Sequence, residues 1–170
     1  MSRKTRTILI VAFAIICAAL AFGWSYKFPK TIDASYEAIE FRDGDAASAG
    51  KTAVTIQGTL YKPLFREEYF RGKITVEGYD YTDSYDLSQV TFDKDINNGE
   101  GYLVYDTVSN GRPILRTFGS IWKEGGFDRL RISVFEPVEG SSKSAKGLTI
   151  AAPATDYEEA QAIADKAAVQ

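Results

Sequence analysis

The chain has 170 residues, slightly more acidic than basic residues (23 against 20), no histidine and a single cysteine. Without histidine, Ser-His-Asp and Cys-His catalysis and histidine-ligated zinc sites are excluded. No Walker-type loop or dinucleotide fingerprint occurs, and no cofactor is expected. Three basic residues, Arg3, Lys4 and Arg6, precede the first apolar run. The remainder carries a net charge of −6, which argues against a nucleic-acid partner.

The N-terminus has the pattern of an export signal. Residues 1–7 form a basic tail, and residues 8–26 form the predicted membrane segment, whose apolar run from Ile8 to Trp24 would span about 26 Å as a helix, close to the hydrocarbon thickness of a bilayer. The basic tail is predicted to stay in the cytoplasm, with Trp24 and Tyr26 at the membrane interface. A single-pass anchor in the lipid bilayer is therefore expected, with the rest of the chain outside the cytoplasm. The alternative is a signal peptide cleaved near Ala21, which would give a secreted protein.

An alternation of polar and apolar residues dominates residues 36–153, after an expected linker at residues 27–35 in which a proline disfavours helix. Leu130, Ile132 and Val134, for example, face one side while polar side chains face the other, as in a half-buried antiparallel strand. A small antiparallel β-sandwich or partly open barrel of about seven or eight strands is predicted. Strand character occurs in residues 39–41, 54–56, 74–76, 90–92, 102–105, 114–121, 130–134 and 148–150.

Helical spacing replaces this alternation in residues 154–170. Thr155 and Glu158 have the spacing of a capping box, so a helix is predicted from Thr155 to Val169. The helix either packs on its own domain, remains a tail, or binds a partner. Its apolar stripe is thin and consists of Tyr157, Ala160, Ile163, Ala164 and Ala167.

Acidic residues suggest one enzymatic alternative. A glycoside hydrolase needs two carboxylates at a controlled separation and requires no histidine. Acidic residues among polar neighbours more often form a solvated surface, so this hypothesis ranks second. The candidates are Glu67, Glu68, Asp80, Asp83 and Asp86.

One acidic loop is a weak calcium candidate, because Asp93, Asp95 and Asn97 place oxygen ligands at alternate positions. The glycine of the loop falls one position later than in an EF-hand, and a valine replaces the bidentate glutamate. The competing interpretation is a hairpin turn at residues 97–99 between the two flanking strands.

Aromatic and basic residues alternate in one segment of the exported part, where rings beside cations could hold a sugar polymer or an anionic envelope polymer. The alternative is that these rings close one end of the β core while the charges face water. The candidate ligand-binding residues are Tyr61, Phe65, Arg66, Tyr69, Phe70 and Arg71. Three further tyrosines, Tyr79, Tyr81 and Tyr85, are added because tyrosine is enriched at binding surfaces.

These features predict a membrane-anchored, extracytoplasmic and non-catalytic binding or accessory module. It would contact the bilayer through residues 8–26 and recruit a protein or an envelope polymer at the membrane surface. Two alternatives stay open: a carboxylate-dependent hydrolase of surface glycans, and a small structural subunit of a membrane complex. The second rests on small residues such as Cys17 and Ala18 in the apolar run, which permit close helix packing.

Overall fold

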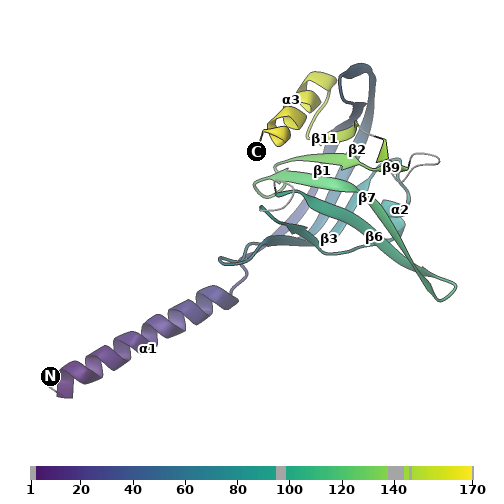
Figure 1. Cartoon of the computed structure of the whole chain (residues 1–170). Coiled ribbons are helices and arrows are strands. Elements are labelled where there is room, and N and C mark those ends of the chain that lie inside the picture. The colour runs from purple at the N-terminus through teal and green to yellow at the C-terminus, as the bar shows by residue number, and fades with distance from the viewer. Residues whose placement is uncertain (1–2, 95–98, 138–143, 146, 170) are drawn as a thin grey trace.

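The structure, a computed structural model, describes residues 3–94, 99–137, 144–145 and 147–169. An N-terminal helix leads into a mainly antiparallel β domain, and a short C-terminal helix lies on the outside of that domain (Figure 1). The helices are α1 (Arg3–Ser25), α2 (Tyr81–Ser84) and α3 (Tyr157–Ala168). The strands are β1 (Pro29–Arg42), β2 (Asp45–Tyr61), β3 (Glu68–Val76), β4 (Asp86–Leu87), β5 (Val90–Phe92), β6 (Gly101–Ser109), β7 (Arg112–Glu124), β8 (Arg129–Val134), β9 (Glu136–Pro137), β10 (Ser144–Ala145) and β11 (Leu148–Ala152).

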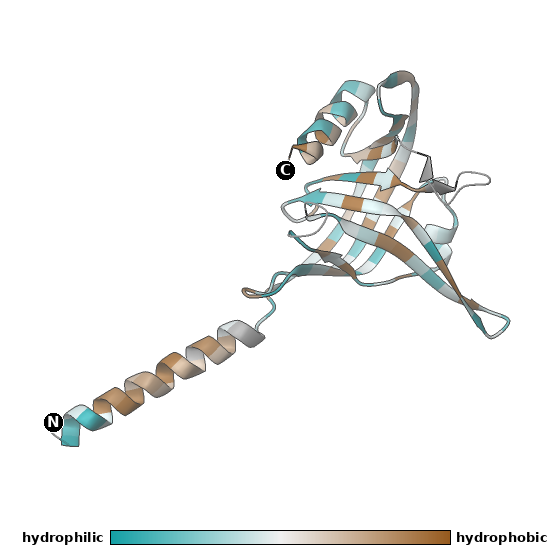
Figure 2. Cartoon of the chain, viewed as in Figure 1, coloured by the Kyte–Doolittle hydropathy of each residue, from teal (hydrophilic) through white to brown (hydrophobic). Residues whose placement is uncertain are grey.

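The N-terminal helix α1 extends away from the β domain (Figure 1), and its apolar side chains are exposed. Over Arg3–Gly23 it is long and apolar enough to span a membrane. Figure 2 shows the basic tail and the apolar run of α1 as two distinct parts of one helix. Of the two residues expected at the interface, Tyr26 is 43 % exposed just beyond the helix, and the Trp24 side chain lies outside the described part of the chain.

The expected linker at residues 27–35 is mostly a strand. Only three residues separate α1 from β1, and Pro29 to Ser35 already pair with β2. Proline is tolerated here because it is the first residue of the strand, where its missing N–H costs little. The Lys62 N–H donates to the Lys27 carbonyl (2.8 Å), which continues the β1–β2 pairing toward the helix.

The main sheet is a nearly closed barrel. Its strand order is β4-β6-β7-β8-β11-β1-β2-β3-β5, with antiparallel neighbours throughout. The sheet closes where β5 meets the start of β6: a Cβ at Gly101 would clash with the Val90 side chain and lie 3.0 Å from the Thr91 carbonyl oxygen. The sheet has nine strands, so the predicted seven or eight was too low. The additional strand, β4, has two residues, which is too short to show alternation.

Inward-facing side chains of the barrel form one core. A different structural element closes each end of the barrel. α2 covers the end of the barrel farther from α1, which we call the far end (Figure 1). At the near end, beside α1, Phe127 places a fully buried ring against Phe70 and Phe92, at centroid distances of 5.2 and 5.9 Å. Phe127 sits in the β7–β8 turn with φ 70°, a conformation rare for a bulky residue and sustained here by the burial of its ring.

The C-terminal helix packs on the outer face of the sheet over β11, β8 and β1. Its alanines allow close approach, and its buried side chains join a second apolar cluster. This arrangement matches the expectation that the helix packs on its own domain. The members of this cluster are Ile39, Phe41, Trp122, Ala151, Ala154, Ala160, Ile163, Ala164 and Ala167.

The N-terminal cap of α3 lies one residue later than predicted. The N-cap is Asp156, whose Oδ1 accepts from the Glu159 N–H (2.9 Å). Glu159 reaches back to the Thr155 N–H and hydroxyl, both at 2.9 Å. Asp156 and Glu159 therefore have the spacing of a capping box, in place of Thr155 and Glu158, but the return bond of Glu159 goes to Thr155, the residue before the N-cap.

Removal of this cap should weaken α3. We expect Asp156→Ala to lower the free energy of unfolding by about 1 kcal/mol, because one N–H at the helix start loses its acceptor. Trp122 fluorescence in a Trp24→Phe background reports the change, since Trp122 is buried beneath α3. The matched control is Glu158→Ala, expected to change stability by less than about 0.5 kcal/mol. A larger loss of stability for Glu158→Ala than for Asp156→Ala would instead support the cap at Thr155 and Glu158 that was predicted from sequence.

Candidate functional site

The predicted ligand-binding residues do not form one site. Tyr61, Tyr69 and Arg71 lie at or near the near end of the barrel, where β2 and β3 pair. Phe70 is fully buried in the core and is excluded from ligand contact. Phe65 and Arg66 lie in the exposed loop between β2 and β3. The three remaining tyrosines, Tyr79, Tyr81 and Tyr85, lie at the far end around α2.

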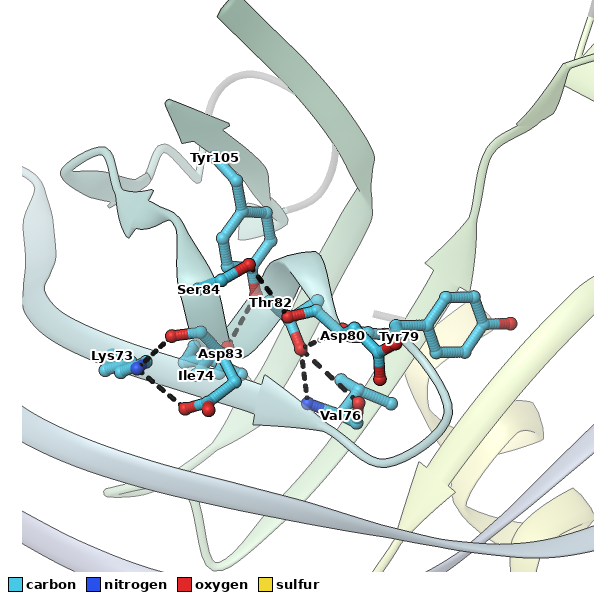
Figure 3. Close-up of polar contacts among 9 residues, drawn as sticks. All are labelled: Lys73, Ile74, Val76, Tyr79, Asp80, Thr82, Asp83, Ser84 and Tyr105. Atoms are coloured by element: carbon cyan, nitrogen blue, oxygen red, sulfur yellow. Dashed lines mark hydrogen bonds and ion pairs between the residues drawn. The ribbon is translucent and has the colours of Figure 1, made fainter. Parts of the chain in front are cut away.

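At the far end, Thr82 fixes α2 to the end of β3 (Figure 3). Its buried hydroxyl accepts from the Val76 N–H (2.9 Å) and donates to the Tyr79 carbonyl (2.8 Å). Beside it, the Tyr105 hydroxyl donates to the Ile74 carbonyl (2.7 Å), and Lys73 pairs with the Asp83 carboxylate (2.7 Å). The bonds of Thr82 and Tyr105 satisfy polar groups that would otherwise be buried without partners, whereas the Lys73–Asp83 pair lies at the surface.

The three tyrosines around α2 pack as a lid on the core. The Tyr79 hydroxyl donates to Glu40 (2.6 Å), and its ring lies 4.7 Å from that of Phe118. Arg116 lies over the rings of Tyr81 and Tyr85, at 5.1 and 5.9 Å. Burial raises the pKa of the Tyr81 hydroxyl, although the Arg116 charge opposes the shift. These contacts indicate that the far-end tyrosines close the core of the barrel and favour this role over ligand binding.

Loss of the Thr82 hydroxyl should loosen this lid. Thr82→Val keeps the side-chain volume but leaves the Val76 N–H without its acceptor. We therefore expect the free energy of unfolding to fall by about 1–3 kcal/mol. Thr82→Ser keeps the hydroxyl and should recover more than half of that loss. Thr117→Val, at an exposed strand position, is the control and should be near neutral. Equal effects of the serine and valine variants in urea unfolding would show that the hydroxyl contributes nothing.

At the near end, the outer face of β2–β3 carries an aromatic–cation strip, composed of Lys27, Tyr61, Tyr69 and Arg71. The two tyrosine rings stack at 4.7 Å and 16°. The Lys27 ammonium and the Arg71 guanidinium lie 5.9 and 5.5 Å from the Tyr69 centroid. The Arg71 Nε also donates to the Gln89 amide oxygen (2.8 Å), so its guanidinium is held in a fixed position. The strip presents positioned cations to solvent.

A pocket of about 330 Å³, which we call the mouth pocket, opens at the same end. Of the residues that the structure describes, four charged ones line it: Lys62, Lys94, Lys123 and Glu68. The Lys123 ammonium contacts Glu68 at 2.8 Å and lies 4.7 Å from the Phe92 ring centroid, while Lys62 lies 3.7 Å from the Glu68 carboxylate. One carboxylate therefore faces three ammonium groups, and the lining carries an excess of positive charge.

Burial and the charges of the lining together shift the pKa values of Lys123 and Glu68 in the mouth pocket. Burial lowers the pKa of Lys123, and the charges of Lys62 and Lys94 lower it further against the opposing effect of Glu68. Burial alone would raise the pKa of Glu68, but the hydrogen bond from Lys123 and the charges of the three lysines outweigh it and hold that pKa below its ordinary range. An anionic ligand would relieve the repulsion among the lysines.

Removal of the single carboxylate should be costly. Glu68→Gln leaves the Lys123 ammonium without its counter-charge, and we expect a loss of about 1–3 kcal/mol in the free energy of unfolding at neutral pH. The double variant Glu68→Gln/Lys123→Met should recover most of this loss. Glu67→Gln, at the neighbouring exposed position, should be near neutral.

The pH dependence provides a second readout of the same pair. Because the pKa of Glu68 is lower in the folded than in the unfolded state, its stabilising contribution is complete above the ordinary value of 4.5 and is lost as the pH falls below it. Urea unfolding at several pH values should therefore give a shallower acid decline for Glu68→Gln than for the unchanged chain. Parallel declines would contradict a stabilising role for the Glu68 carboxylate.

The lysines of the mouth pocket were not among the residues predicted from sequence. One signal was present: Lys123 follows Ile121 by two residues on β7, which places it on the inward face of the strand. The predicted strand ended at residue 121, two residues before this inward lysine, whereas β7 continues to Glu124. Its partner Glu68 is 55 residues away in sequence, and only the closure of the barrel brings the two together.

The five acidic candidates for glycoside hydrolysis fall into two separate groups. Glu67 and Glu68 lie at the start of β3, whereas Asp80, Asp83 and Asp86 follow its end, roughly 26 Å along the strand. That distance exceeds the separation used by glycoside hydrolases for any pair drawn from both groups. No cluster of three metal-ligating side chains occurs among the residues that the structure describes.

The calcium candidate can be assessed only at Asp93, whose carbonyl accepts from the Gly99 N–H (3.0 Å). Asp95 and Asn97 lie outside the described residues. The strands expected to form a hairpin here have other partners: β5 pairs with β3, and β6 pairs with β4 and β7. In the described ranges, the expected β5–β6 hairpin is therefore wrong.

A larger open groove of about 620 Å³ lies between α3 and the sheet. Its two cations, Lys166 and Arg129, both pair with Glu124, at 2.6 and 3.1 Å, and the lining also contains Glu37 and Glu159, so acidic residues balance the basic ones. The groove is larger than the mouth pocket but has no comparable charge excess. The near end of the barrel is therefore the stronger candidate for ligand binding.

The fold and the near-end geometry define a nearly closed antiparallel barrel behind an N-terminal apolar helix, with basic and aromatic side chains where the two meet. Comparisons of the chain with known protein families, curated proteins and solved structures give no match. The function must therefore be argued from the geometry of the near end.

Proposed function

We propose that the chain is a membrane-anchored, non-catalytic binding module that holds an anionic polymer of the cell envelope close to the bilayer. In this proposal α1 is a single-pass anchor, with the basic tail in the cytoplasm and the barrel outside it. The observation that carries the proposal is the excess of cations at the near end, where Lys27 and Arg71 flank Tyr69 and three lysines line the mouth pocket.

The near-end cations are held in place by neighbouring side chains, which supports a role in binding an anionic ligand. A free arginine or lysine side chain loses conformational entropy when it binds. Arg71 has already lost much of that freedom through the Tyr69 ring and the Gln89 amide, and Lys123 is held by Glu68. Preorganised cations bind anions with a smaller entropic cost, which favours a binding role for the strip.

The arrangement suits an extended ligand. Glu68 and Tyr69 are consecutive on β3, so the mouth pocket and the aromatic–cation strip lie on opposite faces of the same strand end. A polymer with repeated carboxylates or phosphates that passes over this end of β3 would contact both the mouth pocket and the aromatic–cation strip. Each exposed charge contributes little by itself, but several engaged together give useful affinity.

Loss of two outward cations should weaken polymer binding. For Arg66→Ser/Arg71→Ser in the full chain, we expect about tenfold weaker binding to polygalacturonate or polyphosphate, because two charge-assisted contacts are lost. Binding should also weaken with added salt. Co-sedimentation of the polymer with vesicles that carry the protein measures the effect.

The matched control removes two exposed cations elsewhere: Lys51→Ser/Arg112→Ser, on β2 and β7 away from the near end. The net-charge change is identical, so a general electrostatic effect would weaken both double variants equally. Equal loss in both would overturn near-end recognition. Unchanged binding of the Arg66/Arg71 variant, with its circular dichroism intact, would do the same.

A further inference from the structure

The loop between β2 and β3, residues 62–67, carries two exposed apolar side chains beside α1. Leu64 is 59 % exposed and Phe65 is 57 % exposed. A Cβ at Gly23 would lie 3.6 Å from Leu64 Cδ1 and 3.9 Å from Phe65 Cε2, so both side chains reach the last turn of the helix. Figure 2 shows apolar residues at the tip of this loop, next to the end of the apolar helix.

The position of Gly23 sets the depth of the loop. Gly23 is the last residue of the part of α1 that can span a membrane, and the helix ends two residues later at Ser25. At about 1.5 Å per residue, the loop tip reaches about 3 Å back along the helix from its end. Where α1 crosses a bilayer, Leu64 and Phe65 are level with the boundary between hydrocarbon and headgroups.

The residues around the loop have the composition of a membrane interface. Tyr26 and Phe28 are 43 % and 42 % exposed, and the Tyr26 ring lies 4.6 Å from that of Phe28. Basic residues alternate with these apolar groups: Lys27 precedes Phe28, and Lys62 and Arg66 flank the loop tip. Aromatic rings and basic side chains are the groups that anchor proteins at headgroup level.

The connection between α1 and the barrel holds the loop in this position. The Tyr26 N–H continues the helix by donating to the Phe22 carbonyl, and the Tyr26 ring stacks on that of Phe22 at 5.2 Å. The Lys62 N–H donates to the Lys27 carbonyl, which ties the first residue of the loop to the connection. Only three residues separate helix and strand, so the loop has little freedom to turn away from α1.

We infer that the β2–β3 loop is a second membrane contact, in which Leu64 and Phe65 insert into the interfacial layer of the leaflet where α1 ends. The occupant of this surface is the lipid bilayer, because α1 itself brings the bilayer to the loop. The inference rests on the proposed role of α1 as an anchor. It adds that the barrel is held in one orientation, with its near end toward the headgroups.

The test places a fluorescent probe on the loop in the full chain. In a Cys17→Ala background, Leu64→Cys is labelled with an environment-sensitive dye and the protein is reconstituted in vesicles of phosphatidylcholine and phosphatidylglycerol. The control is Val108→Cys, because Val108 is 72 % exposed on the β6–β7 hairpin at the far end. Full burial of one such side chain corresponds to about a tenfold or greater preference for the inserted state. Iodide should therefore quench position 64 severalfold less than position 108, and lipids spin-labelled near the headgroup should quench only position 64.

A double variant separates insertion from simple proximity. With the dye moved to Lys62→Cys, Leu64→Asp/Phe65→Asp should raise iodide quenching severalfold, whereas Val108→Asp/Leu115→Asp should leave it unchanged. Both pairs are exposed, so the fold should persist in each.

Two results would overturn the inference, and they differ in what else they affect. Equal iodide quenching at positions 64 and 108, in protein that resists alkaline extraction from the vesicles, would remove the loop contact and leave the anchor in place. Complete extraction of the protein at alkaline pH would remove the anchor and the loop contact together.

Discussion

Closure of the nine-stranded sheet is the constraint on which the rest of the structure depends. It requires backbones to approach closely at Gly101, and again where Gly58 of β2 faces Gly72 of β3, since a Cβ at either position of that pair would clash with the partner backbone. The space above the Gly58–Gly72 pair is filled by the ring of Phe70. Once the sheet closes, its inward side chains form one core, and the molecule has two ends whose residues are far apart in sequence.

The two ends are closed by different chemistry, and this difference gives the barrel its polarity. At the far end, α2 is held by the Thr82 hydroxyl and covered by tyrosine rings. The polar groups of Thr82, Val76 and Tyr79 bond to one another there. At the near end, a single ring from Phe127 fills the opening, and the lysines around it share one carboxylate. Within the described part of the chain, the lysines at the near end therefore outnumber the carboxylates that face them.

Local pattern predicted the elements well and their assembly poorly. Alternation located four of the nine sheet strands, and short apolar runs located four more, such as β11, which is buried on both faces; β4 is too short to show either pattern. The cap of α3 was misplaced by one residue because Thr155 and Asp156 are both good capping residues, and tertiary contacts decide between them. The near-end lysines could not be grouped from sequence, since strand order determines that Lys123 meets Glu68. For the same reason, the tyrosines near α2 could not be separated from Tyr61 and Tyr69.

The uneven charge of the exported part bears directly on how it could meet an anionic surface. With a net charge of −6 beyond the apolar run, the domain as a whole is repelled by anionic polymers and lipids. At physiological salt, however, charges act over about 8 Å, so each face of the barrel presents its own local charge. The near end is locally basic and also carries Leu64 and Phe65. An anionic bilayer attracts the domain through its near end and repels it through an acidic face. Repulsion at the acidic faces therefore helps to select the one orientation in which the lysines and the loop face the bilayer.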